Sequence, residues 1–480
     1  RWVKLDVVRR ATPVRLRGLK SGLALAAGLK GLAFDRQSGI ALEPGLLLGR
    51  GIVSAKGRLD AGKLRAHFAE RPDESRELLR VGQAKAATAF VLDIHSFFLD
   101  GTEATELFRG HRVTASLEPG ALLEAARLAG GSLARIVGPD GSFVYSHDPS
   151  TGRTSPSYNI LRHGGTVYAM IELFEATREK ALLDAAERAI RYLVAQAVTV
   201  RVGQREFSCI AEGGYVKLGG NALAIVALAR HAAVTGDRRH LPLMQRLAGW
   251  MLATQKADGR FGVHKLRVSD GKAMDVRSDY YPGESLLALV RLHALDGDAR
   301  WLDAAEKGAG YLINVRDRGL ALGQLNHDHW LLYALNELYR VRRKALYVRH
   351  AFRIVDAILL KQNRNPGIPD WHGSYYRPPR STPTATRSEG LAAAYQLARD
   401  FDTPDRAACI LEGIRLGVAF QLRTQFRPES VLYFDDPQQW LGAFRESLTG
   451  CETRIDFTQH NLSALLGLRR ILLAKAKRPD

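Results

Sequence analysis

Apolar residues recur at helical spacing over most of this chain, beginning near Gly120. In the first such run they repeat every three or four residues until Pro139-Asp140-Gly141 interrupts the pattern, which predicts a helix over about 120–136. Six further apolar runs follow, each opened by a polar or glycine-rich cluster. The openings recur at intervals of about 45 to 70 residues, a repeat length typical of arrays of helical hairpins.

Each repeat is interpreted as an inner helix, a short turn and an outer helix. Inner helices are predicted to start near Asn159, Gly219, Pro282, Asp328, Thr386 and Asp456, and outer helices near Lys180, Arg239, Ala299, Lys344 and Pro404. This gives six inner helices but only five outer ones. The helix over 120–136, which precedes all the hairpins in the chain, supplies the sixth outer helix and so predicts a closed ring. A ring buries the face that each hairpin alone leaves exposed, and it brings all six openings to one mouth.

Residues 1 to about 115 lack the helical period. They combine a Gly/Leu-rich stretch over 18–51 with a predicted strand over 87–99, a turn at Asp100-Gly101 and a short following strand. We therefore predict a mainly α fold: a small α+β domain of unknown role over 1–117, and an (α/α)6 toroid over 118–480.

Charge limits the classes of partner. The 480 residues include 69 Lys and Arg against 50 Asp and Glu, a formal net charge of +19 that favours polyanions. The basic residues are dispersed, without zinc-finger spacing or basic-aromatic alternation, so nucleic acid is not the expected partner. An acidic polysaccharide or oligosaccharide fits the charge better. The three cysteines are too few and too far apart for a disulfide framework, and oligomeric state is not predicted.

The N-terminal segment is basic, as segments next to a membrane often are, with Arg1, Lys4, Arg9, Arg10, Arg15, Arg17, Lys20 and Lys30 against Asp6. No signal peptide is visible, and no run reaches the length of a membrane span. Because the sequence starts at Arg1, removal of a leader or anchor stays open. Together with a composition rich in Arg, Ala, Leu and Gly, this favours a bacterial protein that is periplasmic or membrane-associated.

The predicted ring resembles the (α/α)6-toroid, or six-hairpin, superfamily of carbohydrate-active enzymes over about residues 118–475. Its members include glycosidases, unsaturated glucuronyl hydrolases, polysaccharide lyases, sugar 2-epimerases and the helical domain of glucuronyl C5-epimerases. The resemblance rests on the architecture and the Trp/Asp/Gly-rich openings. The segment from Arg454 to Leu462 is also similar to the last-helix segment of the C5-epimerases, although their tyrosine-rich catalytic segments are not matched.

Hydrolysis of a glycosidic bond requires two carboxyl groups on either side of it. At the predicted mouth, Asp328 is the proposed acid because His329 and Trp330 crowd it and would raise its pKa. Glu284 or Asp456 is the proposed partner. Glu389 is a further candidate, because it is predicted one turn further into its helix than a capping residue would be. Asp328 and Asp456 also stand where helix N-caps belong, so capping is an equal alternative for them.

Epimerisation or elimination instead requires a base that removes a proton beside a carbonyl group, a role for His or Tyr. His329 and His460 are assigned as catalytic from a larger set of candidates for this chemistry: His163, His329, His372 and His460, with Tyr168, Tyr280, Tyr281, Tyr375 and Tyr376. His327 and His329 stand beside Asp328, but no third ligand occurs at a metal-binding spacing, so no metal and no cofactor are predicted.

Substrate binding is assigned to the cationic and aromatic residues near the openings. Arginines hold carboxylates through two hydrogen bonds, and sugar rings stack on aromatic faces. The candidates are Arg162, His163, Tyr280, Tyr281, Trp330, Trp371, Tyr375, Tyr376, Arg387, Arg445 and Arg454.

The sequence therefore predicts a carbohydrate-active enzyme acting on an acidic, uronic-acid-containing glycan, as the resemblance and the cationic mouth imply. Glycoside hydrolysis by paired carboxyl groups is the leading hypothesis. A uronate C5-epimerase or polysaccharide lyase that uses His and Tyr is the first alternative. A non-catalytic toroid that binds polysaccharide or a partner protein in a glycan-biosynthesis assembly is the second.

Overall fold

The computed structural model describes residues 2–15, 30–34, 41–54, 58–69, 88–101, 103–112, 116–401 and 403–476, and the fold consists of two compact units. The sheet unit comprises residues 1–115, 146–155 and 422–454. The ring unit comprises 116–145, 156–421 and 455–480. The sheet unit thus includes two segments that the sequence-based division at 117 assigned to the toroid. Most of the predicted Gly/Leu-rich stretch, with Arg17 and Lys20, lies outside the described residues.

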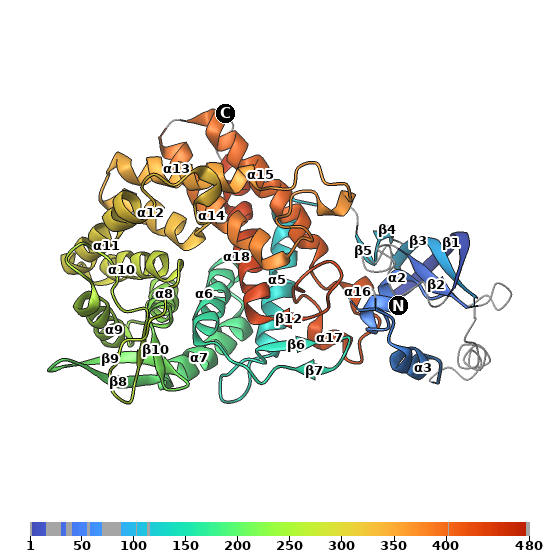
Figure 1. Cartoon of the computed structure of the whole chain (residues 1–480), viewed down its shortest axis with the longest axis horizontal. Helices are drawn as coiled ribbons and strands as arrows, with labels where there is room; N and C mark the ends of the chain where they lie inside the picture. The colour runs from blue at the N-terminus through green and yellow to red at the C-terminus, as the bar shows by residue number, and fades with distance from the viewer. Residues whose placement is uncertain are drawn as a thin grey trace. The chain divides into compact units, whose positions relative to one another are not determined.

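Six long helices form the inner layer of the ring unit, which Figure 1 shows from one end. Each packs against two inner neighbours, and the last packs against the first, so the layer closes on itself. They are α6 (Ile160–Thr177), α8 (Leu218–Thr235), α10 (Tyr281–Asp296), α12 (His329–Val341), α14 (Ser381–Asp400) and α18 (Ile455–Ala476).

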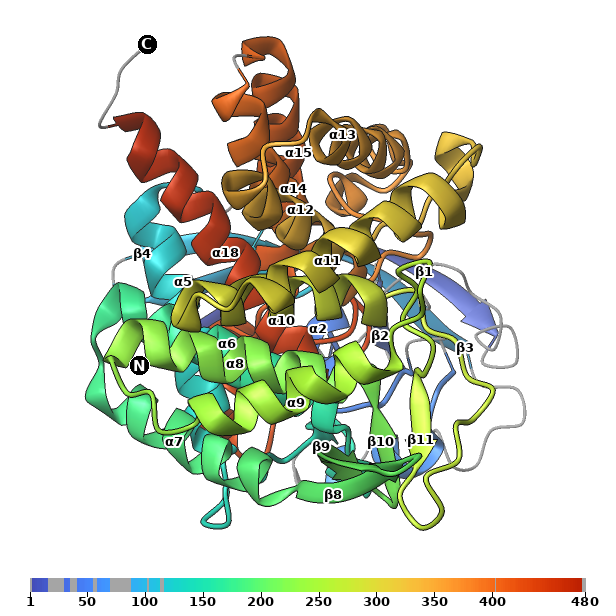
Figure 2. The same ribbon diagram turned by 90° about the vertical axis from the view of Figure 1, so that its left-hand side faces the viewer.

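Six further helices form the outer layer, each running beside an inner partner (Figure 2). They are α5 (Pro119–Arg135), α7 (Lys180–Ala195), α9 (Leu241–Thr254), α11 (Ala299–Tyr311), α13 (Ala345–Leu360) and α15 (Pro404–Arg423). α5 packs against α18, as the predicted closure of the ring requires. Three short helical elements lie in the connections from an outer helix to the next inner helix: η2 (Leu312–Arg316), η3 (Leu322–Gln324) and η4 (Pro369–Trp371).

Helix α8 shows why the inner layer is so apolar. Its residues are almost all buried, because inner helices contact protein on every side. Among the described residues it is also the one helix long and apolar enough, by length and composition, to cross a membrane. Because 78% of that window is buried inside the protein, its composition is explained by its place in the ring core.

The predicted helix starts agree with the structure within about two residues, except for α14. This helix begins at Ser381, five residues before the predicted Thr386. Pro383 lies in its first turn, where the missing backbone N–H costs nothing. The consequence is that Arg387 and Glu389 lie inside the helix, in its second and third turns, rather than at its opening.

Three loops that follow outer helices contain a glycine with positive φ, at Gly141, Gly259 and Gly373. Each presses against the backbone of the next outer helix in the chain. An added Cβ would lie 2.1 Å from the Arg188 carbonyl oxygen, 2.2 Å from that of Lys307 and 2.0 Å from that of Leu416. No side chain fits there, so these glycines fix the spacing of successive hairpins.

The glutamines that end several outer helices stabilise the same loops. Gln255 Nε2 donates to the carbonyl oxygens of Gly259 and Ala304, at 2.9 and 3.0 Å. Gln362 Nε2 donates in the same way to Gly373 and Gly413, at 3.1 and 2.9 Å. The recurring Leu-x-x-Gln of the sequence is therefore a structural feature of the repeat.

A small antiparallel sheet is inserted in the ring unit between α7 and α10, with strand order β11-β10-β9-β8. Its strands are β8 (Ala197–Val202), β9 (Arg205–Glu212), β10 (Tyr215–Lys217) and β11 (Lys265–Arg267). Figure 2 shows it beside α9, on which β9 packs. The sequence analysis did not predict this sheet.

The sheet unit is built on a second antiparallel sheet, in the order β1-β3-β4-β5 with β2 also paired to β3. Its strands are β1 (Trp2–Arg15), β2 (Gly31–Ala33), β3 (Thr88–Asp100), β4 (Glu103–Phe108) and β5 (His111–Arg112). β3, the Gly101 turn and β4 match the predicted hairpin, whereas β1 was not predicted. A core of apolar side chains, including Leu32, Leu47 and Phe68, lies against this sheet.

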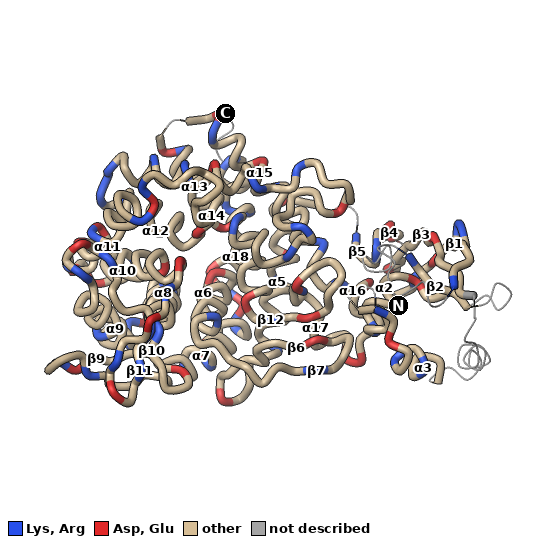
Figure 3. Tube along the Cα trace, viewed as in Figure 1, with Lys and Arg blue, Asp and Glu red and all other residues tan. Residues whose placement is uncertain are grey.

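The remaining elements of the sheet unit are short. They are α2 (Pro44–Gly49), α3 (Ala61–Ala69), α16 (Pro428–Val431), α17 (Pro437–Trp440), β6 (Ser146–Asp148), β7 (Arg153–Thr154) and β12 (Thr453–Arg454). β12, β6 and β7 form a three-stranded sheet that joins segments distant in the sequence. Figure 3 shows Lys and Arg distributed over many elements of both units, in line with the dispersed charge of the sequence.

Candidate active site

A pocket of about 360 Å³ opens among the N-terminal ends of the inner helices, and it is called the central pocket below. Unpaired backbone amides and the helix dipoles make such a position favourable for anionic or hydroxyl-rich groups. Its lining comprises Asn159, Leu161, Arg162, Leu223, Ser278, Tyr280, Tyr281, Glu284, His329, Trp330, Tyr376, Thr382, Pro383, Thr386, Arg387, Asp456, Gln459 and His460.

Two histidines from different inner helices meet in the wall of this pocket. His329 is the first residue of α12 and His460 lies in α18, with their ring centroids 5.1 Å apart and nearly perpendicular. His329 is only 3% exposed, and neither of its ring nitrogens has a hydrogen-bond partner in the described structure. Burial, and then the nearby His460 and Arg387, hold the pKa of His329 well below its usual range. His329 is therefore a neutral base facing the pocket.

His460 is held from behind by a carboxylate. Its Nδ1 atom lies 2.8 Å from Oε1 of Glu389, a fully buried residue of α14. Burial raises the pKa of Glu389 to about 7, although the charge of His460 and its hydrogen bond oppose this shift. Tyr333 contributes a long hydroxyl contact to the same carboxylate, at 3.5 Å. With Nδ1 engaged, the lone pair of a neutral His460 is on Nε2.

The same three side chains are also close enough to form a metal site. One ligand atom from each of His329, Glu389 and His460 lies within 4.8 Å of the other two. Two histidines and a carboxylate are a common ligand set for zinc. The sequence analysis placed Glu389 and His460 at the same mouth as His329, but it considered only His327 and His329 beside Asp328 as ligands and therefore predicted no metal. His327 does not join this cluster.

Glu284 is a second buried acid of the central pocket, in the first turn of α10. It is 4% exposed, and its Oε2 atom has no hydrogen-bond partner in the described structure. Burial, reinforced by the nearby Asp328, raises the pKa of Glu284 well above its usual range. Burial therefore favours the protonated form of the Glu284 carboxyl group.

Asp328, the predicted catalytic acid, does not line the pocket. It is fully buried as the N-cap of α12, and its Oδ1 atom accepts the Leu331 backbone N–H at 3.1 Å. A Cβ added at Gly283 would lie 2.6 Å from its Oδ2 atom, so α10 covers the carboxyl group. Burial does raise the pKa of Asp328 to about 7, as the sequence suggested. The group lacks the access to substrate that a general acid needs.

Asp456, by contrast, lines the central pocket from the first turn of α18. Its Oδ2 atom is 3.2 Å from Nε of Arg162, a residue of α6 whose guanidinium also bonds to the Tyr145 hydroxyl. Arg162 was predicted to bind substrate. Because it is already paired with Asp456, its positive charge is largely compensated.

Arg387 supplies the cation of the pocket that is free of such compensation. Its guanidinium stacks on the rings of Tyr375 and Tyr376, 4.9 and 5.2 Å from their centroids. Nε donates to Nδ1 of His327 at 2.8 Å, and Nη1 donates to the Pro383 carbonyl oxygen at 2.7 Å. Among the residues that the structure describes, no carboxylate pairs with Arg387. It is thus a fixed positive charge available to an anionic ligand.

The predicted aromatic residues divide between wall and rim. Trp330 is buried at 3% exposure and contacts His329, with ring centroids 4.6 Å apart. Tyr281 also lines the pocket, and burial raises its pKa to about 12. Tyr280 and Tyr376 line the pocket with 44% and 56% of their surfaces exposed, so their faces remain available to a sugar ring.

Five predicted binding residues are not in the pocket. Tyr375 is 2% exposed and lines a neighbouring cavity instead. His163 is fully buried and joins α6 to α7, with Nδ1 2.7 Å from the Tyr158 hydroxyl and Nε2 2.8 Å from the Ala189 carbonyl oxygen. Trp371 ends the short helix η4 and does not line the central pocket. Arg445 and Arg454 belong to the sheet unit.

The sequence analysis missed several polar residues of the lining, among them Ser278, Thr382, Thr386 and Gln459. Gln459 adjoins His460 in the predicted last opening, which was a usable signal. Its side chain also fills the space beside Gly165, 2.8 Å from the position of an added Cβ. Ser278 lies in a loop before α10 that carries no recognisable pattern.

No family model matches the sequence, and no curated protein is significantly similar to it. Solved structures are similar over most of the chain. An α-1,6-mannanase of Salegentibacter sp. HEL1_6, an inactive variant in complex with α-1,6-mannotriose, is 13% identical, with 73% of this chain and 99% of that chain covered and a TM-score of 0.52.

A D-mannose isomerase is 12% identical, with coverage of 74% and 97% and a TM-score of 0.52. An unsaturated glucuronyl hydrolase specific for heparin is 15% identical, with coverage of 73% and 98% and a TM-score of 0.51. At this level of identity the comparison shows the fold, and it confirms the predicted (α/α)6 toroid.

Proposed function

We propose that this protein is a carbohydrate-active enzyme that moves a proton on an acidic sugar, as a uronate epimerase does. The observation that carries the proposal is the pair of His329 and His460 in the central pocket, with both nitrogens of His329 unpartnered and His460 held by Glu389. An epimerase requires two acid–base groups close to one carbon atom. The solved structures of this fold include an isomerase and a uronate-processing hydrolase, which supports this choice of substrate and reaction.

In the proposed reaction one imidazole removes the proton from the carbon beside the sugar carboxyl group. The electron pair of the broken C–H bond forms the double bond of an enolate, and the other imidazole, protonated, donates its proton to the opposite face. His329, being neutral, is suited to remove a proton, and His460, whose Nδ1 atom contacts Glu389, is the partner on which the second proton transfer depends. In the reverse direction the roles exchange.

The enolate carries additional negative charge on the former carboxylate. Arg387, which has no carboxylate partner in the described structure, lies near enough to His329 to depress its pKa. A fixed guanidinium at that point stabilises the charge that develops during proton removal. Tyr280 and Tyr376 supply exposed aromatic faces for the ring of the sugar.

Hydrolysis is the second candidate, and one observation favours it: Glu284 and Asp456 both line the central pocket. Glu284, whose pKa is raised by burial, would act as the acid and Asp456 as base or nucleophile. Asp456 forms an ion pair with Arg162. In this mechanism the two carboxyl groups alone would activate the attacking water and the leaving group. We rank this mechanism below proton transfer because it assigns no role to the buried His329, His460 and Glu389.

The experiment is incubation with oligosaccharides of glucuronate and N-acetylglucosamine in heavy water, followed by NMR and product sizing. We expect deuterium at C5, formation of the other C5 epimer and no chain shortening. New saturated reducing ends without deuterium at C5 would establish hydrolysis instead. An unsaturated product would establish elimination, which begins with the same proton removal.

A further inference from the structure

Two more cavities of the ring unit share lining residues with the central pocket. The Arg260 pocket, about 340 Å³, is lined by Arg260, Phe261, His264, Arg277, Tyr311 and Arg316 among others, and it shares Ser278 with the central pocket. The Arg377 pocket, about 470 Å³, is lined by Asn326, His327, Lys361, Asn363 and Arg377 among others. It shares Tyr280, Tyr376 and Arg387 with the central pocket. The central pocket therefore adjoins both of the other cavities, which share no lining residue with each other.

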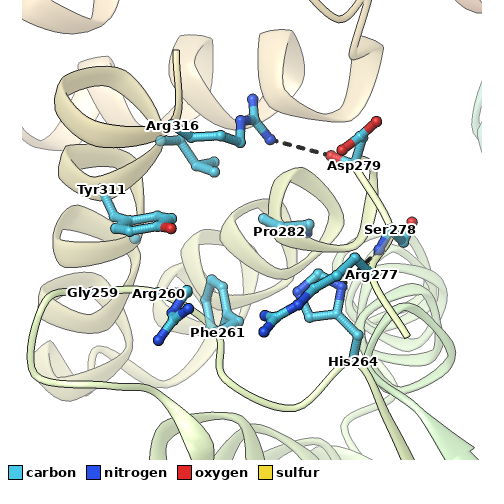
Figure 4. A pocket seen from close by; sticks show the side chains of 12 residues that line it. Gly259, Arg260, Phe261, His264, Arg277, Ser278, Asp279, Pro282, Tyr311 and Arg316 are labelled. Atoms are coloured by element: carbon cyan, nitrogen blue, oxygen red, sulfur yellow. Dashed lines mark hydrogen bonds between the residues drawn. The ribbon is translucent and has the colours of Figure 1, made fainter. Parts of the chain in front are cut away.

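The Arg260 pocket holds uncompensated positive charge. Figure 4 shows the side chains of Arg260 and Arg277 on either side of the Phe261 ring. Within the described parts of the chain neither arginine pairs with a carboxylate, and the buried Nε of Arg260 has no hydrogen-bond partner. Arg316 is different, because it binds both carboxylate oxygens of Asp317 at 2.6 and 2.8 Å.

One acid, Asp279, also lines the Arg260 pocket. Its backbone carbonyl oxygen accepts a hydrogen bond from Arg316 at 3.3 Å, and Figure 4 shows its carboxylate directed away from Arg260 and Arg277. The two free guanidinium groups thus face a space with aromatic walls, Phe261 and Tyr311. Aromatic faces beside guanidinium groups match a sugar ring that carries an anionic substituent.

The Arg260 pocket is held in shape by His264. Its Nδ1 atom accepts the Ser278 backbone N–H at 2.9 Å, which joins the loop before α10 to the loop after α9. Burial, with the positive charge of Arg277, lowers the pKa of His264, so the ring is neutral. A preformed site loses less conformational entropy when ligand binds.

The Arg377 pocket is also cationic. Arg377 Nε donates to Oδ1 of Asn363 at 3.1 Å, and Lys361 lies near enough to His327 to help lower the pKa of that histidine to about 4, after burial and Arg387. No carboxylate of the described ranges pairs with Lys361 or Arg377. Both cavities that adjoin the central pocket therefore carry positive charge.

We infer that the three adjoining pockets form a groove for an internal stretch of an acidic oligosaccharide or polysaccharide. The reacting sugar occupies the central pocket, and anionic units on its two sides occupy the Arg260 and Arg377 pockets. This inference rests on the proposed function for the place of the reacting sugar, and it adds that the substrate is a chain rather than a single sugar. The ligand groups are carboxylates or sulfates, which guanidinium groups bind alike.

The test is calorimetric titration with a hexasaccharide of alternating glucuronate and N-acetylglucosamine, and with glucuronate alone. The double variant Arg260→Gln/Arg277→Gln removes two positive charges from the Arg260 pocket. The double variant Lys361→Gln/Arg377→Gln removes two from the Arg377 pocket. Arg318→Gln/Arg349→Gln is the charge-matched control, since both arginines are exposed and line none of the three pockets. A carboxyl-reduced and an N-sulfated hexasaccharide distinguish carboxylate from sulfate recognition.

Each pocket variant is expected to bind the hexasaccharide about tenfold or more weakly than the control, because each loses two charge-assisted contacts. Glucuronate affinity should stay within about twofold of the control. Hexasaccharide affinities equal to the control in both variants would overturn the groove, and loss on only one side would overturn internal binding. Since binding needs no turnover, this result stands apart from the heavy-water experiment, and a His329→Asn protein can be titrated in the same way.

Discussion

The Nδ1 atom of His460 lies 2.8 Å from Oε1 of Glu389, and this contact joins the two inner helices α18 and α14 below the central pocket. Glu389 itself is fully buried and does not line the pocket. A carboxylate in this position orients an imidazole and fixes its tautomer without touching the substrate. Glu389 is therefore a positioning residue in the proposed mechanism.

Glu389→Gln should lower kcat on the order of a hundredfold while KM changes little, because the amide keeps the shape and the acceptor but not the charge. Burial raises the pKa of Glu389 to about 7, so activity of the natural protein should rise as the pH passes through about 7. The variant should lack this limb of the pH profile. Equal pH profiles for the two proteins would contradict the assignment.

The stability of the same variant provides a control for misfolding. A carboxyl group whose pKa is raised on folding stabilises the folded state below its unfolded value of 4.5, and that contribution is lost as the pH rises to about 7. Compared with the natural protein, Glu389→Gln should therefore unfold at a similar urea concentration at pH 4 and at an equal or higher urea concentration at pH 8. Lost activity with unimpaired stability separates positioning from structural support.

Replacement of either histidine of the pair should separate proton exchange from epimerisation. In a two-base reaction, His329→Asn and His460→Asn should each abolish interconversion, while each still exchanges the substrate proton of one epimer with solvent. NMR detection of deuterium uptake, starting from each pure epimer, measures this directly. Retention of full interconversion by either variant would exclude that histidine from the reaction.

Removal of metal should leave the activity unchanged. His329, Glu389 and His460 are close enough to bind an ion, but the His460 Nδ1 atom already contacts Glu389, which suits an acid–base pair. We expect full turnover after dialysis against a strong chelator, with metal content measured by mass spectrometry. Activity that disappears with one equivalent of metal and returns with zinc would show that these residues are ligands instead.

Much of the ring was predictable because its signals are local. The apolar period, the polar openings and the turn residues repeat in every hairpin, and they placed five of the six inner helices closely. Helix α14 was placed too late, although Pro383 in its first turn is a residue type that favours helix starts. The hairpin of β8 and β9 was missed although Val198, Val200 and Val202 alternate before a turn at Gly203, which has φ of 62°.

The site was less predictable because it depends on contacts between distant segments. His329, Glu389 and His460 were all candidates at the predicted mouth, but the repeat pattern does not show which side chains of the six openings touch one another. Asp328 was singled out for its neighbours in sequence, whereas its burial behind Gly283 depends on the packing of α10 against α12. The contribution of 422–454 to the sheet unit is likewise invisible to local patterns.

Asp328 tests the difference between a cap and a catalytic acid. Asp328→Asn keeps an N-cap acceptor for Leu331, so activity should stay within about threefold, whereas Asp328→Ala should cost about 1 kcal/mol of stability. The pKa of Asp328 is raised from 3.8 to about 7, so its contribution to stability is lost as the pH rises between these values. Urea unfolding should show that the free energy of unfolding decreases less between pH 4 and pH 8 for Asp328→Asn than for the natural protein. Loss of all activity in the Asn variant would restore the hydrolytic role.

Gly141 tests how tightly the hairpins are spaced. It has φ of 86°, and an added Cβ would lie 2.1 Å from the backbone oxygen of Arg188 on α7. Gly141→Ala should therefore destabilise the ring by roughly 2–4 kcal/mol, through backbone strain and displacement of α7. Gly249→Ala is the matched control, because that glycine lies inside α9 with no atom within 4 Å of an added Cβ. The control should gain about 0.5–1 kcal/mol from its higher helix propensity. Urea unfolding of both variants measures the difference, and equal midpoints would show that the loop at Gly141 can move away from α7 without loss of stability.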